Sequence, residues 1–142
     1  MMMLDANLLL YAYDASAAQH PAARTWLEEV LSGNDPVLLP WSSILGFLRI
    51  ATNPRAWKLP LAAADAAGIV DLWLARPNVS IPNPGERHWP ILRELIPASQ
   101  ARGPLISDAH LAALAIEYGV VLCTSDRDFS RFPRLRTFNP LD

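Results

Sequence analysis

The chain has 142 residues, of which 51% are hydrophobic and 18% are charged, a composition typical of a globular protein rather than a disordered one. Its formal net charge of −2 provides no overall attraction to nucleic acid or to an acidic membrane surface. The single cysteine excludes an intrachain disulfide, and no basic segment precedes the first apolar run, so we expect a cytoplasmic protein without a signal peptide. No apolar run approaches the ~20 residues that a membrane-spanning helix needs.

Apolar periodicity and helix-ending residues predict short strands and helices in regular alternation. Short apolar runs predict strands at residues 1–4, 37–39, 78–82, 120–124 and 136–138. Amphipathic segments predict helices at residues 6–13, 21–33, 41–52, 61–75, 86–96 and 108–119, and a helical turn at 126–132. Ser107 is expected to cap the helix at 108–119, and the polar segment 97–104 is expected to be a loop.

Strands that are apolar throughout and alternate with helices are typical of a parallel sheet covered by helices on both faces. We therefore expect an α/β fold, a three-layer α/β/α sandwich around a central parallel sheet. The length of the chain and the lack of an internal linker favour one domain over residues 1–142.

Three aspartates fall near the carboxyl ends of predicted strands, where an open parallel sheet binds its ligands. Asp5 directly follows the first strand, Asp126 follows the strand at 120–124, and Asp108 begins the helix before that strand. Asp108 also suits the positive end of a helix, and Asp126 suits a helix cap, so each has a structural explanation. Asp5 has none, because Asn7 can cap the next helix and a carboxylate among apolar residues is costly unless paired or metal-bound.

Convergence of these three carboxylates would require a cation to offset their repulsion. Oxygen ligands without cysteine or clustered histidine favour Mg²⁺ or Mn²⁺ over zinc, and the three histidines are scattered along the chain. Such a metal typically acts on phosphate esters. Two basic groups are candidates to hold a polyanion of this kind. They consist of Arg49, Arg55 and Lys58, and of Arg127, Arg131, Arg134 and Arg136.

Four segments, taken in order, carry a resemblance to one protein family. They are LDANLLLYAYD at residues 4–14, LPWSSILGFLRIATNPR at 39–55, ISDAHLAALAIEYG at 106–119 and LCTSDRDFSRFPRLRTFNPL at 122–141. These segments resemble the four motif regions of the PIN-domain ribonucleases, in particular the VapC toxins of bacterial type II toxin–antitoxin systems. The first has the aspartate that ends strand one in this family, and together they cover nearly the whole chain.

The resemblance implies a compact α/β/α sandwich and Mg²⁺-dependent endonucleolytic cleavage of RNA, with Mn²⁺ as an alternative metal. In such cleavage a metal-activated water attacks the phosphodiester in line. By position, the resemblance makes Asp5, Asp108 and Asp126 the catalytic and metal-binding acids, with Asp128 as an auxiliary acid.

The resemblance also implies macromolecular partners. The RNA substrate is expected to contact arginines, for which the candidates are Arg49, Arg127 and Arg131. A VapB-type antitoxin encoded alongside is expected to inhibit the protein, and a homodimer is expected. A set of apolar residues exceeds what the short elements around it need, and any that are exposed would suit a dimer face or an antitoxin helix. This set is Trp41, Phe47, Leu48, Trp57 and Leu59, most of which are expected in the core.

The second motif departs from the family pattern. The family has a glutamate about three residues before an arginine on this helix, and here Gly46 precedes Arg49 at that spacing. Glu86 is an alternative source of the carboxylate, although an acid in the first turn of a helix has a structural explanation. The departure keeps a second interpretation open, that of a catalytically weak or inactive PIN domain that binds RNA or an antitoxin.

Two other folds place an aspartate directly after the first strand, the haloacid-dehalogenase-type phosphatases and the response-regulator receiver domains. The phosphatase motif has a second acid two residues later, where this chain has Asn7. Both also need a lysine late in the chain, and Lys58 is the only lysine. Both interpretations are therefore disfavoured.

Overall fold

The computed structural model describes residues 1–142. Short strands and longer amphipathic helices follow one another as the apolar pattern predicts, with a pair of helices between successive strands from β1 to β4. In chain order the elements are β1 (Met2–Leu4), α1 (Ala6–Tyr13), α2 (His20–Ser32), β2 (Val37–Leu38), α3 (Trp41–Ala51), α4 (Ala63–Leu74), β3 (Val79–Ser80), α5 (His88–Ser99), α6 (Leu105–Tyr118), β4 (Val121–Cys123), the 3₁₀ helix η1 (Arg127–Arg131) and β5 (Thr137–Phe138).

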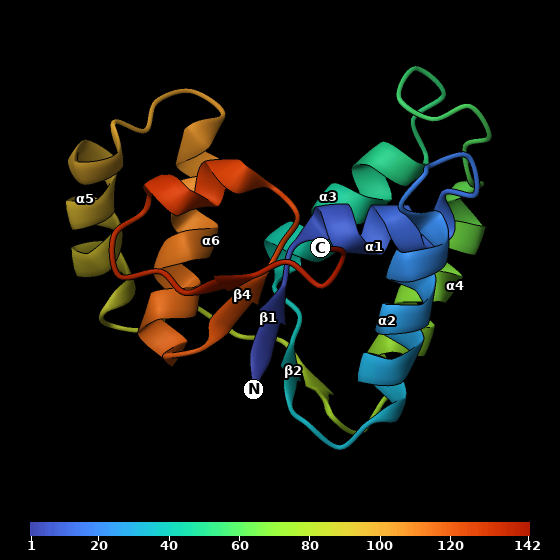
Figure 1. Cartoon of the computed structure of the whole chain (residues 1–142), viewed down its shortest axis with the longest axis horizontal. Coiled ribbons are helices and arrows are strands. Elements are labelled where there is room, and N and C mark those ends of the chain that lie inside the picture. Colours follow the sequence, from blue (N-terminus) through green and yellow to red (C-terminus); the bar gives the residue numbers. More distant parts are fainter.

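All five strands form one parallel sheet in the order β3-β2-β1-β4-β5, so β1 lies at its centre. The register places Leu4 beside Cys123, and Cys123 beside Phe138. The carboxyl ends of β1, β4 and β5 are therefore level with one another at one edge of the sheet (Figure 1). This arrangement confirms the expected parallel sheet and brings the residues that follow β1 and β4 together.

Alternate residues of the strands enter two hydrophobic cores, one on each face of the sheet. Met3 and Leu122 pack with α5 and α6, whereas Leu4 and Cys123 pack with helices α1 to α4. Figure 1 shows these two groups of helices on opposite sides of the strands. The fold is therefore the expected three-layer α/β/α sandwich, and none of its helices has the length and apolar character to cross a membrane.

Two predicted helix boundaries were wrong. Helix α5 continues through Pro97 to Ser99, whose hydroxyl donates to the Leu95 carbonyl at 2.7 Å, and it ends at Gln100 in the left-handed conformation (φ 58°). Helix α6 begins at Leu105, so Ser107 lies inside its first turn and is not the cap. Only residues 100–104 therefore form a loop, which is shorter than the composition of segment 97–104 suggests.

Candidate active site

Asp5 lies where the central strand β1 passes directly into helix α1. Its N–H donates to the Cys123 carbonyl at 3.0 Å, which extends the pairing of β1 with β4 by one residue. Its Oδ1 accepts the N–H of Ala6 at 2.7 Å, so Asp5 itself is the N-cap of α1. The expectation that Asn7 caps this helix was wrong, since Asn7 lies inside the first turn.

The hydroxyl of Thr124 holds the other oxygen of the Asp5 carboxylate. Thr124 Oγ1 donates to Asp5 Oδ2 at 2.7 Å and accepts the N–H of Asp126 at 3.0 Å and Asn7 Nδ2 at 3.4 Å. A hydroxyl has one proton and two lone pairs, so this group is fully used. Thr124 is only 3% exposed, and it therefore fixes the orientation of Asp5 from the neighbouring strand.

Burial raises the pKa of the Asp5 carboxyl above its ordinary value. The hydrogen bonds from Thr124 and Ala6 oppose this effect, and the negative charge of Asp126 adds to it. The carboxylate is thus well oriented by hydrogen bonds but short of positive charge. Beside it, the side-chain oxygen Asn7 Oδ1 is buried and has no hydrogen-bond partner.

Asp108 lies in the first turn of α6, facing the acids that follow β1 and β4. Burial, above all, raises the pKa of its carboxyl from 3.8 to about 6. The negative charges of Asp126, Asp5 and Asp128 act in the same direction, and Arg131 opposes them. The structure therefore brings Asp108 and the two strand-end aspartates within electrostatic reach of one another, as the sequence pattern suggested.

Asp126 is the N-cap of η1, and its Oδ1 accepts the N–H of Asp128 at 2.9 Å. The structural explanation that the sequence offers for Asp126 therefore holds, and it does not compete with a role at the site. Both acids are exposed and add their charge to the field around Asp108.

The donor set fits a divalent cation bound through few protein ligands. No group of three or more His, Cys, Asp or Glu side chains is arranged to hold a metal ion by itself. Mg²⁺ rarely uses such a cage, because it retains several waters and binds through one or two carboxylates and the phosphates of its substrate. Asp5 and Asp108 are two carboxylates whose repulsion a cation would relieve, and the unpaired Asn7 Oδ1 is an oxygen that can accept from water.

The three arginines predicted to contact RNA are all exposed, and neither ion pair in the structure uses them. Arg127 lines a pocket together with Asp126, and Arg49 lines a second pocket that reaches the first turn of α6. Arg131 is close enough to Asp108 to lower its pKa. Two other members of the basic groups have structural partners: Arg134 pairs with Glu94, and Arg136 donates to the Gly119 carbonyl.

Gly46 lies where helices α1 and α3 cross. A Cβ atom on Gly46 would lie 3.1 Å from the Cβ atom of Ala6, closer than such carbons normally approach. Ala6 has little freedom to move, because its N–H is bonded to the carboxylate of Asp5. Any side chain at position 46, a glutamate included, would therefore disturb the helix crossing next to Asp5.

Glu86 does not lie near the acids. It is in the turn before α5, between Gly85 and Arg87, whose N–H groups both donate to Glu117 at 2.9 and 3.1 Å. Glu117 is near the end of α6, nine residues after Asp108, which corresponds to about 14 Å along the helix. Glu86 is thus placed at the opposite end of α6 and does not replace the carboxylate missing at Gly46.

Two histidines that are distant in sequence form a pair. His88 Nε2 and His110 Nδ1 are 2.9 Å apart, and the rings meet edge to face with centroids 4.8 Å apart. Burial and the neighbouring His88 lower the pKa of His110, which disfavours its charged form. The pair links α5 to α6. The spacing of these two histidines in the sequence suggested that they were isolated, but the fold brings them together.

The sequence matches the family model described as PIN domain over residues 2–135. Ribonuclease VapC43 of Mycobacterium tuberculosis is 42% identical over 142 residues, which cover 100% of this chain and 97% of that protein. Ribonuclease VapC31 of the same species is 39% identical over 143 residues, which cover 99% of each chain.

Among solved structures, VapBC2 from Rickettsia felis, bound to a DNA fragment from its promoter, has a similar fold. The TM-score is 0.71 at 19% sequence identity, over 97% of each chain. This likeness agrees with the sandwich seen here, and the sequence relatives align along their whole length. The chain therefore belongs to the PIN-domain family, among the relatives of the VapC ribonucleases.

Proposed function

We propose that this protein is an endoribonuclease, the toxin of a type II toxin–antitoxin system, that cleaves RNA phosphodiester bonds with Mg²⁺, or with Mn²⁺ in its place. The full-length relatives named VapC ribonuclease support the reaction class. The observation that carries the proposal is the group of Asp5, Asp108 and Asp126 at the carboxyl edge of the sheet, where burial and neighbouring negative charges raise the pKa of Asp5 and of Asp108.

Mg²⁺, when bound, supplies polarisation of the phosphoryl oxygen and activation of a water near neutral pH. Asp5 and Asp108 are the residues that hold it, and Thr124 keeps the Asp5 carboxylate in place by its 2.7 Å hydrogen bond. Asp126 adds negative charge that strengthens cation binding. Arg127 and Arg131 lie beside these acids, where guanidinium groups hold the phosphates that flank the bond to be cut.

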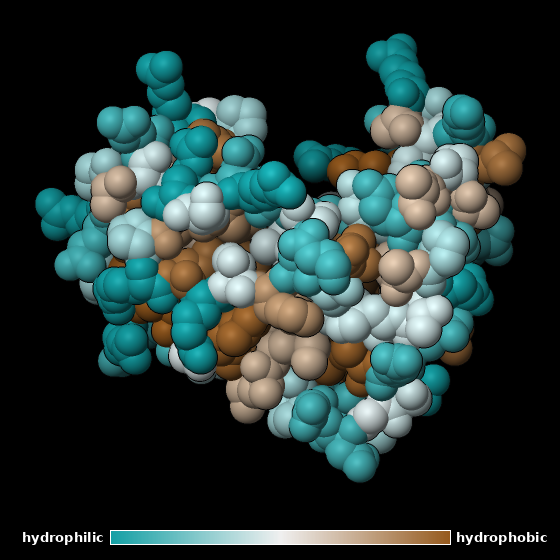
Figure 2. Space-filling view, in the orientation of Figure 1, coloured by the Kyte–Doolittle hydropathy of each residue, from teal (hydrophilic) through white to brown (hydrophobic).

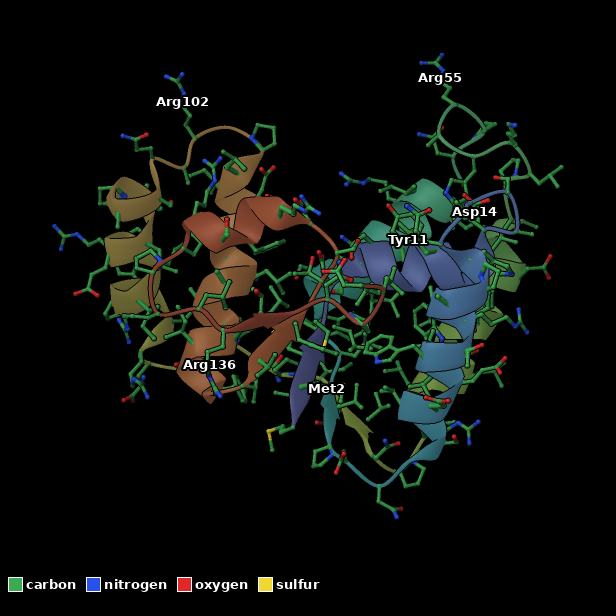
Figure 3. The ribbon with its side chains drawn as sticks, viewed as in Figure 1. Met2, Tyr11, Asp14, Arg55, Arg102 and Arg136 are labelled. Carbon is green, nitrogen blue, oxygen red and sulfur yellow. The ribbon has the colours of Figure 1, made fainter.

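The surface around the site suits an RNA chain. Figure 2 shows a hollow between two lobes at the top of the view, above the carboxyl ends of the strands. Arg55, from the loop after α3, and Arg102, from the loop between α5 and α6, project from the two lobes on either side of it (Figure 3). These cations extend the positive charge of the arginines near the acids.

The test is cleavage of total cellular RNA by the purified protein, with Mg²⁺, with Mn²⁺ and with a chelator. The wild type should cut only when a divalent ion is present, and the Asp5→Asn variant should lose nearly all of this activity. Asp71→Asn, a change at an exposed aspartate on α4 far from the sheet edge, is the matched control and should cut like the wild type. Cleavage by Asp5→Asn at the wild-type rate would place the active site elsewhere.

A second candidate function is that of a PIN domain that binds RNA or an antitoxin without cutting. The close crossing at Gly46 favours it, because a glutamate there would press on Ala6 beside Asp5, and no group of three potential ligands is preassembled. The same assay separates the two functions. RNA binding without cleavage in either metal supports the binding module, and metal-dependent cleavage excludes it.

We propose a VapB-type antitoxin and a second copy of this chain as partners in the cytoplasm. The name of the related Rickettsia felis complex supports the antitoxin. Two of the apolar residues considered for a partner surface are exposed, Trp41 (50%) at the start of α3 and Leu59 (84%) in the loop after it. Phe47 is fully buried, and Leu48 and Trp57 pack partly against the core. Light scattering of the protein, alone and with its co-expressed neighbour gene product, measures both associations.

A further inference from the structure

A pocket of about 600 Å³ opens beside Asp126, and the proposed chemistry uses only Asp126 and Arg127 of its lining. Its walls come from the loop after β4, from η1 and from β5 with the tail that follows, the orange and red segments of Figure 1. Only one of its nine lining residues is hydrophobic. The lining includes Asp126, Arg127, Ser130, Phe138, Asn139 and Asp142.

Phe138, the one hydrophobic residue, is an exposed aromatic ring on a fixed backbone. Its carbonyl accepts the N–H of Thr124 at 3.0 Å, at the same edge of the sheet as the acids, yet its side chain is 53% exposed. In the register, Phe138 is level with Cys123 and Leu4, so it lies two strand spacings, about 10 Å, from the end of β1. A nucleobase next to a phosphate at Asp5 can therefore reach this ring and stack on it.

The charges in the pocket select an uncharged group rather than a phosphate. Two carboxylates, Asp126 and Asp142, line the pocket with a single arginine, Arg127, which the phosphate at the acids already engages, so the interior of the pocket disfavours a further phosphate. Carboxylates accept hydrogen bonds from the amino groups of bases, whereas hydroxyl and amide groups can either donate to a base or accept from it. Asn139 Oδ1 already accepts the N–H of Leu141 at 3.0 Å, which fixes the amide and leaves its NH₂ group to donate.

We propose that this pocket binds one unpaired nucleobase of the RNA substrate, stacked on Phe138 and adjacent to the phosphate at the acids. The proposal rests on the ribonuclease function proposed above and adds to it a residue that selects the substrate, Phe138. Because a base inside a duplex presents no free face to the ring, the pocket selects single-stranded RNA over double-stranded RNA.

Binding tests the pocket without any cleavage. A short fluorescein-labelled single-stranded RNA of mixed sequence is titrated by fluorescence anisotropy in chelator, with Asp5→Asn as the background for every variant. Phe138→Ala should raise the Kd about tenfold, the usual effect of losing one stacked base. Phe138→Trp keeps a ring and should stay within about twofold of the background. A duplex of the same strand should bind equally to all of them.

Trp89→Ala is the matched control, because Trp89 is an aromatic residue of similar exposure (60%) on α5, outside the pocket. It should leave the Kd for single-stranded RNA unchanged. The proposal is overturned if Phe138→Ala binds single-stranded RNA as the background does, if Phe138→Trp weakens binding as much as Phe138→Ala, or if the duplex is affected equally.

Kinetics separate failure of the pocket from failure of the ribonuclease function. In a protein that retains Asp5, the single change Phe138→Ala should raise KM about tenfold for single-stranded RNA, while kcat stays close to the wild-type value. If the wild type cleaves RNA in a metal-dependent way and Phe138→Ala has the same KM, the base-binding proposal is wrong and the ribonuclease function stands. Absence of cleavage by the wild type contradicts the ribonuclease function, and the anisotropy result then still decides whether the pocket binds a base.

Discussion

Thr124 Oγ1 donates a 2.7 Å hydrogen bond to Asp5 Oδ2, across 119 residues of sequence. The bond joins the ends of the two neighbouring strands β1 and β4, and its donor, Thr124, is buried. It lowers the pKa of a carboxyl that burial raises, and it holds that carboxylate toward the edge of the sheet where Asp108 and Asp126 lie. Thr124 is thus a positioning residue for the proposed metal site.

Replacing Thr124 by valine should lower the cleavage rate without unfolding the protein. Valine has nearly the same shape, but it cannot donate to Asp5, and a hydrogen bond to a charged group is worth about 1.5–3 kcal/mol, or roughly a 10- to 100-fold change. Because the lost bond had lowered the Asp5 pKa, the pH–rate profile should also move to higher pH. Steady-state kinetics against pH measure both effects.

Thr124→Ser is the control for this change, since it keeps the hydroxyl and should restore most of the rate and the wild-type pH profile. A purely structural role for Thr124 would lower thermal stability in the valine variant and leave the pH profile in place. An unchanged rate and profile for Thr124→Val would show that the Asp5 orientation does not matter for cleavage.

Gly46→Ala should destabilise the protein, although alanine favours helices over glycine. The new Cβ would lie 3.1 Å from the Ala6 Cβ, and Ala6 is held by its bond to Asp5. Overpacking of this kind costs about 1–3 kcal/mol, against a gain of roughly 1 kcal/mol in helix propensity, so a net loss of up to about 2 kcal/mol is expected. Urea unfolding of the two proteins measures the difference in free energy of unfolding.

Gly68→Ala on α4 is the matched control, because nothing lies within 4 Å of the Cβ it would add. It should stabilise the protein by about 0.5–1 kcal/mol. Equal stabilisation by both alanines would show that the α1–α3 crossing has room at Gly46. In that case the missing glutamate would have no steric explanation.

Glu86→Gln should leave RNA cleavage unchanged, whereas Asp108→Asn should abolish it. Glu86 lies beside the end of α6 that is opposite to Asp108, and its charge does not act on the pKa of Asp5 or Asp108. The rate of cleavage of a defined RNA in Mg²⁺ measures both changes. A strong loss in Glu86→Gln would mean that Glu86 reaches the acids in the active protein.

Local pattern was sufficient to predict the architecture and the convergence of the acids at one edge of the sheet. Asp5 and Asp126 could be identified because each interrupts or follows a short apolar run, and strand ends converge in any parallel sheet. The alternation of apolar strands and amphipathic helices likewise predicted the three layers. The apolar runs and helical periodicity depend only on residues that are neighbours in sequence, and the convergence of strand ends is common to all parallel sheets.

The residues that sequence could not identify depend on contacts between distant segments. Thr124 is a common strand residue until the pairing of β1 with β4 places it beside Asp5. His88 and His110 meet only because α5 and α6 form a hairpin. The reason for Gly46 is a Cβ contact between two crossing helices. No local signal marks such partners, so sequence reasoning missed these supporting contacts, whereas it could propose the charged residues.

The raised pKa of Asp108 makes the metal-free protein less stable at neutral pH than at acid pH. The folded protein holds this proton up to about pH 6, whereas the unfolded chain releases it near its ordinary 3.8. Because the folded state binds more protons between these values, its stability falls as pH rises through them and stays lower above them. After allowance for solvent screening, the loss is about 1 kcal/mol.

Asp108→Asn removes that loss, so in chelator at about pH 7.5 the variant should be more stable than the wild type, by about 1 kcal/mol. At about pH 4, where the wild-type carboxyl is protonated, the two proteins should unfold at the same temperature. Added Mg²⁺ should then stabilise the wild type at neutral pH and leave Asp108→Asn unchanged, because only the wild type retains both carboxylates. Calorimetry across this pH range measures all three. A variant that is less stable than the metal-free wild type at neutral pH would show that Asp108 is stabilised by its surroundings rather than poised for a cation.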